Sequence, residues 1–252
     1  MVWLERKTVK SDVDKGQQIR VAAAGGALLV SAVLAQRIVT QRSAPVATTP
    51  QPAGPAAPST GTPAVPRPAG SAPSLIDRCE AAILREVPAR RLSPVATRTL
   101  AIQLVTVCAE EGYPLDLAFG HAYAESSLQL TAVNPSSKAT GPLQVTPIAA
   151  QQVGAAWPMT TPAAQIRAGL RYMKWLRSAY PACRSSVRET LRHYGMGPGN
   201  WQKYKRGELT CSTPLSVARA ELGCQGARPY SATVLAIAQR HPELKTTAWW
   251  GS

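Results

Sequence analysis

The sequence predicts a mainly α-helical domain over residues 75–252, preceded by a membrane helix and a proline-rich linker. Apolar residues recur at helical spacing from Leu75 onward, and alternating strand patterns are nearly absent there. Proline, alanine, threonine, serine and glycine make up almost all of residues 44–74, a composition that cannot bury a core. We therefore expect one helical domain of about 175 residues behind a spacer.

The N-terminal part divides into a basic leader, residues 1–20, and an apolar segment, residues 19–39. The apolar run from Val21 to Ala35, broken only by Ser31, is short for a membrane span of ~20 residues, but flanking arginines can reach the interfaces and extend it. The basic flank places residues 40–252 outside the cytoplasm. A signal peptide cleaved after Ala35 is the alternative to the uncleaved anchor that we favour.

Residues 40–74 are predicted to form a disordered linker. Nine of the 31 residues from Ala44 to Ser74 are proline, so the segment should be extended and semi-rigid. Its reach is about 3 Å per residue in the polyproline II conformation. Such a spacer would let a tethered domain search a polymer at a distance from the membrane.

The apolar spacing predicts a series of helices in the C-terminal domain. They are expected at Leu75–Glu86, Pro94–Glu111, Leu115–Ser127, 145–153, 162–180, 185–193 and 230–241. Glycine and proline indicate turns at 135–141 and 195–200.

Charge and cysteine content narrow the function classes. A net charge of +14 favours a polyanionic partner such as nucleic acid, anionic lipid or an anionic wall polymer, although it also suits a solubilising surface. No cysteine pair has C-x-x-C spacing and no histidine sits at a zinc-like offset, so we expect no metal and no cofactor. Outside the cytoplasm, up to two disulfides are possible, and we expect at least one. The cysteines are Cys79, Cys108, Cys183, Cys211 and Cys224.

Glu125 is the strongest candidate for a catalytic side chain. It lies near the end of the third predicted helix, on a face shared with Ala118 and Ala122. A carboxyl group against an apolar face loses hydration, which favours its protonated form and lets it act as a general acid. His121, one turn earlier, could touch Glu125, but packing is the commoner role for a single histidine.

Four motifs in order, with a closing element, resemble the soluble lytic transglycosylase family. They are Glu125-Ser126-Ser127, Gly141-Pro142-Leu143-Gln144, Tyr172-Met173-Lys174-Trp175-Leu176 and His193-Tyr194-Gly195-Met196-Gly197-Pro198-Gly199, followed by Pro229-Tyr230 and Val234. The resemblance covers roughly residues 100–240 and implies a lysozyme-like fold. Pro142 and Gly195 depart from the family pattern, and Gly195 stands where the family has asparagine.

The resemblance implies roles for the matching residues. Glu125 corresponds to the catalytic acid/base, Gln144 to a glutamine that lines the glycan groove, and Tyr194 to a tyrosine beside the catalytic carboxyl. Ser126 would hold the following loop. We expect the Tyr194 hydroxyl to donate a hydrogen bond to Glu125 or to the substrate. The family's groove serine corresponds to one of three loop residues, Asn134, Ser136 or Ser137.

The family's chemistry suits a site with one carboxyl group. Two-carboxylate glycosidases need a second acid nearby, and residues 126–145 hold none. The resemblance implies cleavage of the bond between N-acetylmuramic acid and N-acetylglucosamine in peptidoglycan, with a 1,6-anhydro product. The expected setting is a membrane-anchored enzyme in the periplasm, or a virion-associated one, serving secretion, conjugation or phage entry.

Two other classes of function compete with this interpretation. A hydrolytic muramidase of goose-lysozyme type would share the fold. A non-catalytic basic protein that binds glycan or nucleic acid would share the charge, but nucleic-acid motifs are absent and we expect no nucleic-acid partner.

Overall fold

The computed structural model describes residues 72–88 and 92–249 of the chain. The predicted membrane segment and most of the linker lie outside the described residues. None of the helices in the described ranges is long and apolar enough to cross a membrane.

The described part of the chain is mainly helical, as predicted. Its α-helices are α1 (Leu75–Glu86), α2 (Pro94–Glu111), α3 (Leu115–Ser126), α4 (Pro147–Gln152), α5 (Pro162–Ala179), α6 (Pro181–Arg184), α7 (Val187–Met196), α8 (Pro198–Lys205), α9 (Ser216–Glu221) and α10 (Tyr230–Arg240). Two single turns of 3-10 helix follow α9 and α10, η1 (Cys224–Gly226) and η2 (Pro242–Leu244).

Local signals explain where the long helices begin. Ser74 accepts a hydrogen bond from the Asp77 N–H while the Asp77 carboxylate accepts one from the Ser74 N–H, which makes a capping box for α1. α2 and α5 each start with a serine or threonine cap followed by proline at the first helical position. α2 ends at Gly112, whose φ of 59° is left-handed.

Three short helices escaped the sequence prediction. α6, α8 and α9 have 4, 8 and 6 residues, too few for an apolar periodicity to show. The turn expected over 195–200 is confined to Gly197, with φ 76° and ψ 147°, and α8 begins at the next residue. The expectation of a longer turn there was wrong, because one glycine suffices to redirect the chain from α7 into α8.

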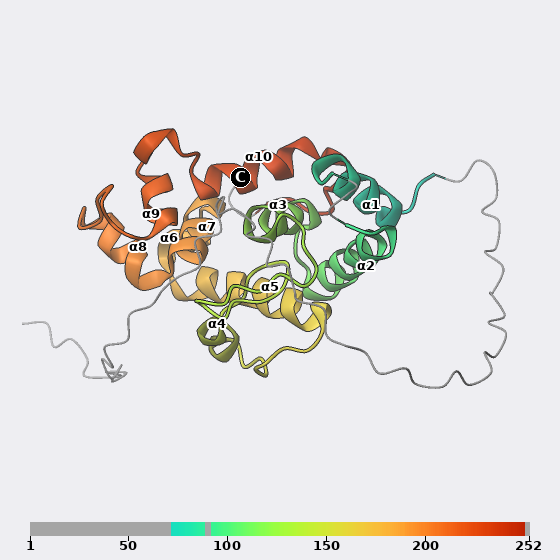
Figure 1. Cartoon of the computed structure of the whole chain (residues 1–252), viewed down its shortest axis with the longest axis horizontal. Helices are drawn as coiled ribbons and strands as arrows, with labels where there is room; N and C mark the ends of the chain where they lie inside the picture. The colour runs from blue at the N-terminus through green and yellow to red at the C-terminus, as the bar shows by residue number, and fades with distance from the viewer. Residues whose placement is uncertain (1–71, 89–91, 250–252) are drawn as a thin grey trace, which may run out of the picture.

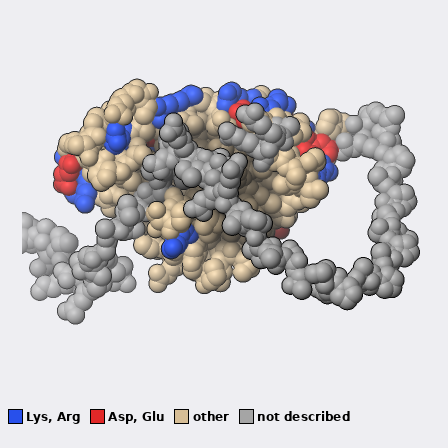
Figure 2. All heavy atoms as spheres, viewed as in Figure 1, with Lys and Arg blue, Asp and Glu red and all other residues tan. Residues whose placement is uncertain are grey.

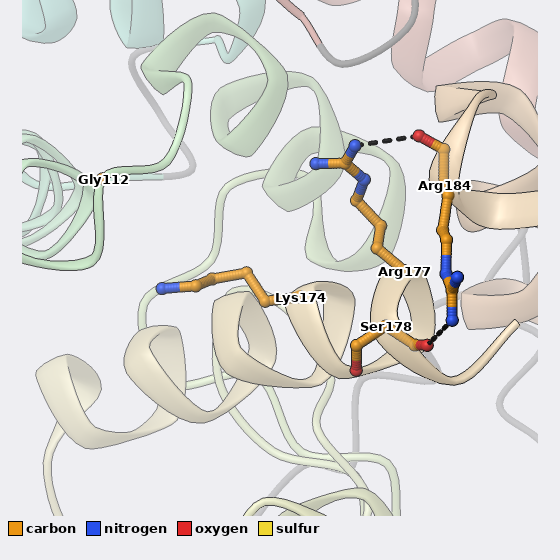
Figure 3. A pocket seen from close by; sticks show the side chains of 5 residues that line it. All are labelled: Gly112, Lys174, Arg177, Ser178 and Arg184. Carbon is orange, nitrogen blue, oxygen red and sulfur yellow. Dashed lines mark hydrogen bonds between the residues drawn. The ribbon is translucent and has the colours of Figure 1, made fainter. Parts of the chain in front are cut away.

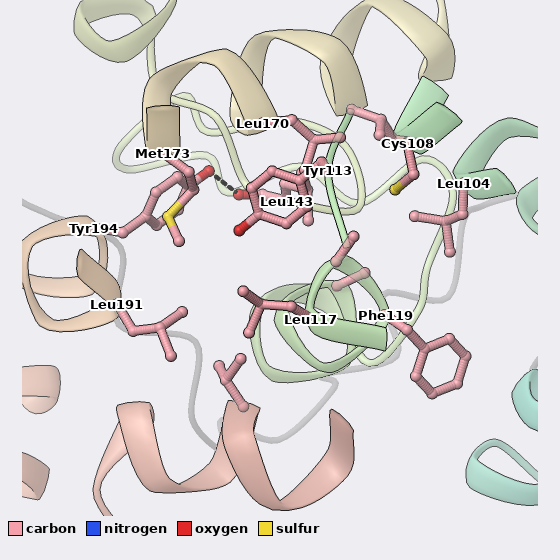
Figure 4. Close-up of a cluster of buried hydrophobic side chains, with 14 of the residues drawn as sticks. Leu104, Cys108, Tyr113, Leu117, Phe119, Leu143, Leu170, Met173, Leu191 and Tyr194 are labelled. Atoms are coloured by element: carbon pink, nitrogen blue, oxygen red, sulfur yellow. Dashed lines mark hydrogen bonds between the residues drawn. The ribbon is translucent and has the colours of Figure 1, made fainter. Parts of the chain in front are cut away.

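α3 is the central helix of the domain and packs against α2 and α10 (Figure 1). Most of its residues are buried on every side, as expected for a helix enclosed by others. Gly120 permits the close approach of α10, since a Cβ atom there would lie 2.3 Å from the Val234 carbonyl oxygen. Figure 4 shows side chains from α2, α3, α5 and α7 meeting in the core, among them Leu104, Leu117 and Leu191.

Isolated β-bridges and a disulfide constrain the irregular segments. In the loop between α3 and α4, Thr140 forms isolated antiparallel bridges with Val133 and Val145. Between α8 and η1, a disulfide joins Cys211 to Cys224, which confirms the expectation of at least one disulfide. The remaining cysteines, Cys79, Cys108 and Cys183, are buried free thiols.

Candidate active site

The site is built around the last turn of α3. Glu125 is the penultimate residue of that helix, and the chain turns sharply after it because Ser127 and Leu128 have φ values of 52° and 63°. Glu125 is 6% exposed, so its carboxyl group is largely withdrawn from water while still reaching the surface. A carboxyl group in this setting is suited to proton transfer with a bound substrate.

Tyr230 provides the closest contact to Glu125. Its hydroxyl donates a hydrogen bond of 2.6 Å to Glu125 Oε1. Tyr230 is the first residue of α10, after Pro229, so the packing of α10 on α3 carries the phenol to the carboxyl group. Burial, followed by the negative charge of Glu125, raises the pKa of Tyr230 well above its usual range, so the phenol remains a donor.

Gly195 makes room for the Tyr230 ring. A Cβ atom at Gly195 would lie 2.9 Å from Tyr230 Cδ1 and 3.1 Å from Val217 Cγ1. The departure from the family's asparagine therefore has a steric consequence here, because a side chain at this position of α7 would displace the phenol that bonds Glu125.

Tyr194 does not make the hydrogen bond to Glu125 that was one of its two expected roles, and a bond to the substrate stays a prediction. Its hydroxyl donates to the Leu143 carbonyl oxygen at 2.7 Å (Figure 4), and Tyr230 occupies the expected place beside the carboxyl group. The ring of Tyr194 lies edge-on to His121, with centroids 4.2 Å apart. The closing motif Pro229-Tyr230 marked Tyr230 as part of the pattern. The sequence did not indicate which of the two tyrosines contacts Glu125.

Ser126 and Gln144 organise the loops that flank Glu125. The Ser126 hydroxyl donates to the Ala122 carbonyl at 3.0 Å and accepts from the Gln129 N–H at 3.1 Å, which holds the chain after the helix. The Gln144 amide donates to the carbonyl oxygens of Ala132 and Gly141, at 3.2 and 3.0 Å. Gln144 itself has a left-handed φ of 46°, which these bonds help to maintain.

The three candidates for the groove serine share one turn. Asn134 Oδ1 accepts hydrogen bonds from the backbone N–H groups of Ser136 and Ser137, at 3.0 and 3.1 Å. Asn134 is thereby committed to shaping the turn, as asparagine commonly is. The Ser137 hydroxyl accepts from the Ala139 N–H at 3.3 Å, whereas Ser136 is exposed.

The two other buried carboxylates of the described ranges have structural partners. Asp116 accepts hydrogen bonds from the Leu117 N–H at 2.8 Å and from the Trp249 indole at 2.7 Å, at the opposite end of α3 from Glu125. Glu221 accepts from Arg192 and from the Ser231 N–H, both at 2.9 Å. Neither carboxylate has the open oxygen that a second catalytic acid needs.

A cavity of about 380 Å³ lies away from the predicted site residues. Figure 3 shows that it is lined by the residues Gly112, Lys174, Arg177, Ser178 and Arg184. Two of its arginine side chains donate hydrogen bonds to backbone carbonyls near helix ends. Arg177 donates to the Arg184 carbonyl and Arg184 to the Ser178 carbonyl, each at 2.9 Å. Cations that satisfy the last carbonyls of helices are a common stabilising feature.

The potential for metal binding is low in this part of the chain. Within residues 72–88 and 92–249, no group of three or more His, Cys, Asp or Glu side chains could hold a metal ion. In Figure 2, most of the visible Lys and Arg side chains lie along the upper edge and at the left end of the molecule. At Glu125, the carboxyl group whose Oε1 accepts from the Tyr230 hydroxyl is suited to proton transfer.

The described residues form a mainly helical domain with one buried, phenol-bonded glutamate at the end of its central helix. Residues 109–212 match the family model described as the transglycosylase SLT domain. The chain thus carries a transglycosylase SLT domain, the domain type of peptidoglycan lytic transglycosylases.

Solved structures and curated proteins were also compared. The chain is similar to an inactive mutant of the lytic transglycosylase Slt from Pseudomonas aeruginosa, with 17% identity and a TM-score of 0.44. That similarity covers 67% of this chain and 30% of the Pseudomonas chain. No curated protein matches this chain.

Proposed function

We propose that this protein is a peptidoglycan lytic transglycosylase that cleaves the bond between N-acetylmuramic acid and N-acetylglucosamine and leaves a 1,6-anhydro end. The observation that carries the proposal is the buried Glu125 carboxyl group, bonded by Tyr230 within a chain that contains an SLT domain.

Glu125 would act first as an acid and then as a base. Its proton passes to the glycosidic oxygen while the bond from C1 of the muramoyl residue to that oxygen breaks. The C6 hydroxyl oxygen of the same residue then attacks C1, and its proton returns to the Glu125 carboxylate. The enzyme is regenerated and no water is consumed.

Tyr230 supports both steps from the opposite side of the carboxyl group. Because its hydroxyl occupies Oε1, the proton to be transferred is directed to Oε2. The same hydrogen bond stabilises the carboxylate that exists between the two proton transfers. Such preorganised donors are commonly the largest electrostatic contribution to catalysis.

A hydrolytic muramidase of goose-lysozyme type is the second candidate. It would bring water to C1 and normally place a second carboxylate about 5–9 Å from the first. The engagement of Asp116 and Glu221 with structural partners favours the reaction without water. A non-catalytic glycan-binding protein, the third candidate, would have no need for the Tyr230 hydrogen bond to Glu125.

We also propose that the domain acts outside the cytoplasm. The Cys211–Cys224 disulfide supports this location, because disulfides persist in oxidising compartments. An N-terminal anchor and a role in local wall opening, for a secretion or conjugation machine or for phage entry, extend the same proposal. Protease protection of the full chain in membrane vesicles would test the orientation.

Replacement of Glu125 by glutamine tests the catalytic assignment. The change is nearly isosteric, so the thermal midpoint should stay close to that of the wild type. The rate of fragment release from purified peptidoglycan should fall by at least ~100-fold, because the general acid is lost. Wild-type cleavage by Glu125→Gln would exclude Glu125 as the acid/base.

Mass spectrometry of the wild-type products separates the candidate functions. A lytic transglycosylase releases anhydro-ended fragments that do not react with borohydride. A muramidase releases fragments one water heavier with reducible ends. Binding of the wild-type protein to peptidoglycan without release of fragments would instead indicate a glycan-binding protein.

A further inference from the structure

His121 stands one helical turn before Glu125 and faces the same carboxyl group. The pair has i, i+4 spacing on α3, and His121 Nε2 lies 3.7 Å from Glu125 Oε1. This separation exceeds the hydrogen-bond distance of about 3.0 Å by less than about 1 Å. A small rotation of the Glu125 side chain would close the gap.

His121 differs from the other two histidines in its lack of hydrogen bonds. It is completely buried, and neither ring nitrogen has a hydrogen-bond partner among the described residues. By contrast, His193 Nδ1 lies 2.9 Å from the Glu189 carbonyl oxygen, and His241 Nε2 lies 2.9 Å from Glu86 Oε1. Buried polar groups are nearly always bonded, so an exception next to a catalytic carboxyl indicates a function.

Aromatic rings fix the position of the imidazole. The Tyr194 ring of α7 lies edge-on to His121 with centroids 4.2 Å apart, and the Tyr230 ring of α10 lies 6.1 Å away. These neighbours enclose His121 between α3, α7 and α10. Its nearest charged group is the Glu125 carboxylate. The ring is therefore packed between aromatic neighbours, and Glu125 Oε1, which already accepts from Tyr230, is the carboxylate oxygen nearest to its Nε2.

The other titratable groups around the pair remain neutral. Tyr194, Tyr230 and Tyr113 all have a pKa well above the usual range because of burial, and burial raises the pKa of Tyr172 to about 12. Apart from Glu125, which acts on Tyr194 and Tyr230, the charged side chains that act on these tyrosines are Arg177 and Asp116, both on Tyr113. These phenols therefore keep their protons near neutral pH and add no charge around the pair.

We propose that His121 is a positioning residue that donates its Nε2–H to Glu125 Oε1 once Glu125 has given its proton to the leaving oxygen. This inference rests on the proposed function. The imidazole only donates a hydrogen bond and keeps its own proton, so the proton balance of the reaction is unchanged. Together with Tyr230, it gives the transient carboxylate two donors on one oxygen.

This role predicts a shift in the pH dependence of the reaction. A donor that stabilises the carboxylate makes the protonated acid form disappear at a lower pH. Without the donor, the acid form of Glu125 persists to higher pH, so the basic limb of the pH–rate profile shifts to higher pH. The maximal rate falls at the same time, because the charge formed in the first step loses part of its stabilisation.

Two substitutions in the full chain separate the donor from the packing of the ring. His121→Leu removes the donor but keeps an apolar side chain, and its thermal midpoint should equal or exceed that of the wild type, since an unbonded polar group is lost. We expect kcat to fall about 10- to 100-fold with little change in KM. His121→Gln places an amide N–H near the Nε2 position and should restore most of the rate and the wild-type basic limb.

His193→Leu is the matched control, because it removes an equally buried histidine that has its own partner on α7. It should change the thermal midpoint without moving the basic limb of the profile. A wild-type rate and profile for His121→Leu would overturn the proposal. So would equal losses of activity in the leucine and glutamine variants while both remain folded, since the ring would then matter through packing alone.

Nitrogen NMR of the three histidines gives a readout that does not depend on activity. The Nε2 resonance of His121, assigned by its absence from His121→Leu, should respond to the ionisation of Glu125 in the wild type and not in Glu125→Gln. If the wild-type protein releases no anhydro-ended fragments, the proposed function is wrong, but the NMR measurement still tests the contact between His121 and Glu125 on its own. A His121 resonance unaffected by Glu125→Gln would refute the contact itself.

Discussion

At the scale of single residues, the two tyrosines of the site have different hydrogen-bond acceptors and therefore different roles. The Tyr230 hydroxyl bonds the Glu125 carboxyl group, whereas the Tyr194 hydroxyl bonds the Leu143 carbonyl in the loop before α4. The two phenols are similarly buried, so their environments differ mainly in the acceptor. Removal of each hydroxyl should therefore have a different consequence.

Tyr230→Phe and Tyr194→Phe make a matched pair of variants. Tyr230→Phe should lower the rate of glycan cleavage about 10- to 100-fold, because a hydrogen bond to a charged group contributes roughly 1.5–3 kcal/mol. Tyr194→Phe should mainly lower the free energy of unfolding, by about 1–3 kcal/mol, since a buried carbonyl loses its donor. Release rates and urea unfolding on the same preparations measure both effects. The reverse pattern would return the catalytic role to Tyr194.

At the scale of elements, the site depends on the close crossing of α3 and α10. Gly120 lies against the α10 backbone at Val234, and Gly195 of α7 accommodates the ring of Tyr230. Both glycines are buried within helices, where their lack of a side chain permits contact between elements. The distance from Tyr230 to Glu125 therefore depends on how closely the helices pack.

Gly120→Ala should separate α3 from α10. The new Cβ atom would meet the Val234 carbonyl oxygen at 2.3 Å, so the helices must move apart, at a cost of about 1–3 kcal/mol or more. Cleavage should fall together with stability. Gly199→Ala is the control, because a Cβ atom at this position of α8 meets nothing within 4 Å. Equal thermal midpoints for the two variants would show that the crossing tolerates a side chain.

At the scale of the whole molecule, the described domain has its own core and its own helix caps. α1 begins at Leu75 behind the Ser74 capping box, and α1 packs on α2. At the other end, Trp249 bonds Asp116 at the start of α3, so the last described residues also belong to the domain. The predicted division at residue 75 is therefore open to a direct test.

The fragment of residues 74–252, which retains Ser74 as the α1 cap, should fold and cleave peptidoglycan without residues 1–73. Its helices and core contacts lie within residues 74–249, so the linker should contribute little stability. Circular dichroism, the thermal midpoint and the release rate should match those of the full chain. An unfolded fragment beside a folded full chain would place the domain boundary farther toward the N-terminus.

The sequence by itself determined the helical class, the long helices and the position of Glu125 near a helix end. These follow from local rules, since the apolar spacing, the serine and threonine caps and the proline at first helical positions act within a few residues. Short helices such as α8 and α9 fell below that signal because they span too few turns to show a period.

Only the tertiary structure decided which side chains surround the carboxyl group. Tyr230 is 105 residues from Glu125 in the chain, and its contact depends on the α3–α10 crossing that Gly120 permits. Tyr194 rather than Tyr230 was expected beside Glu125, because two tyrosines on different helices cannot be ranked by local pattern. The spacing of His121 allowed a contact with Glu125 but favoured a packing role, and its complete burial and unbonded nitrogens depend on rings from α7 and α10.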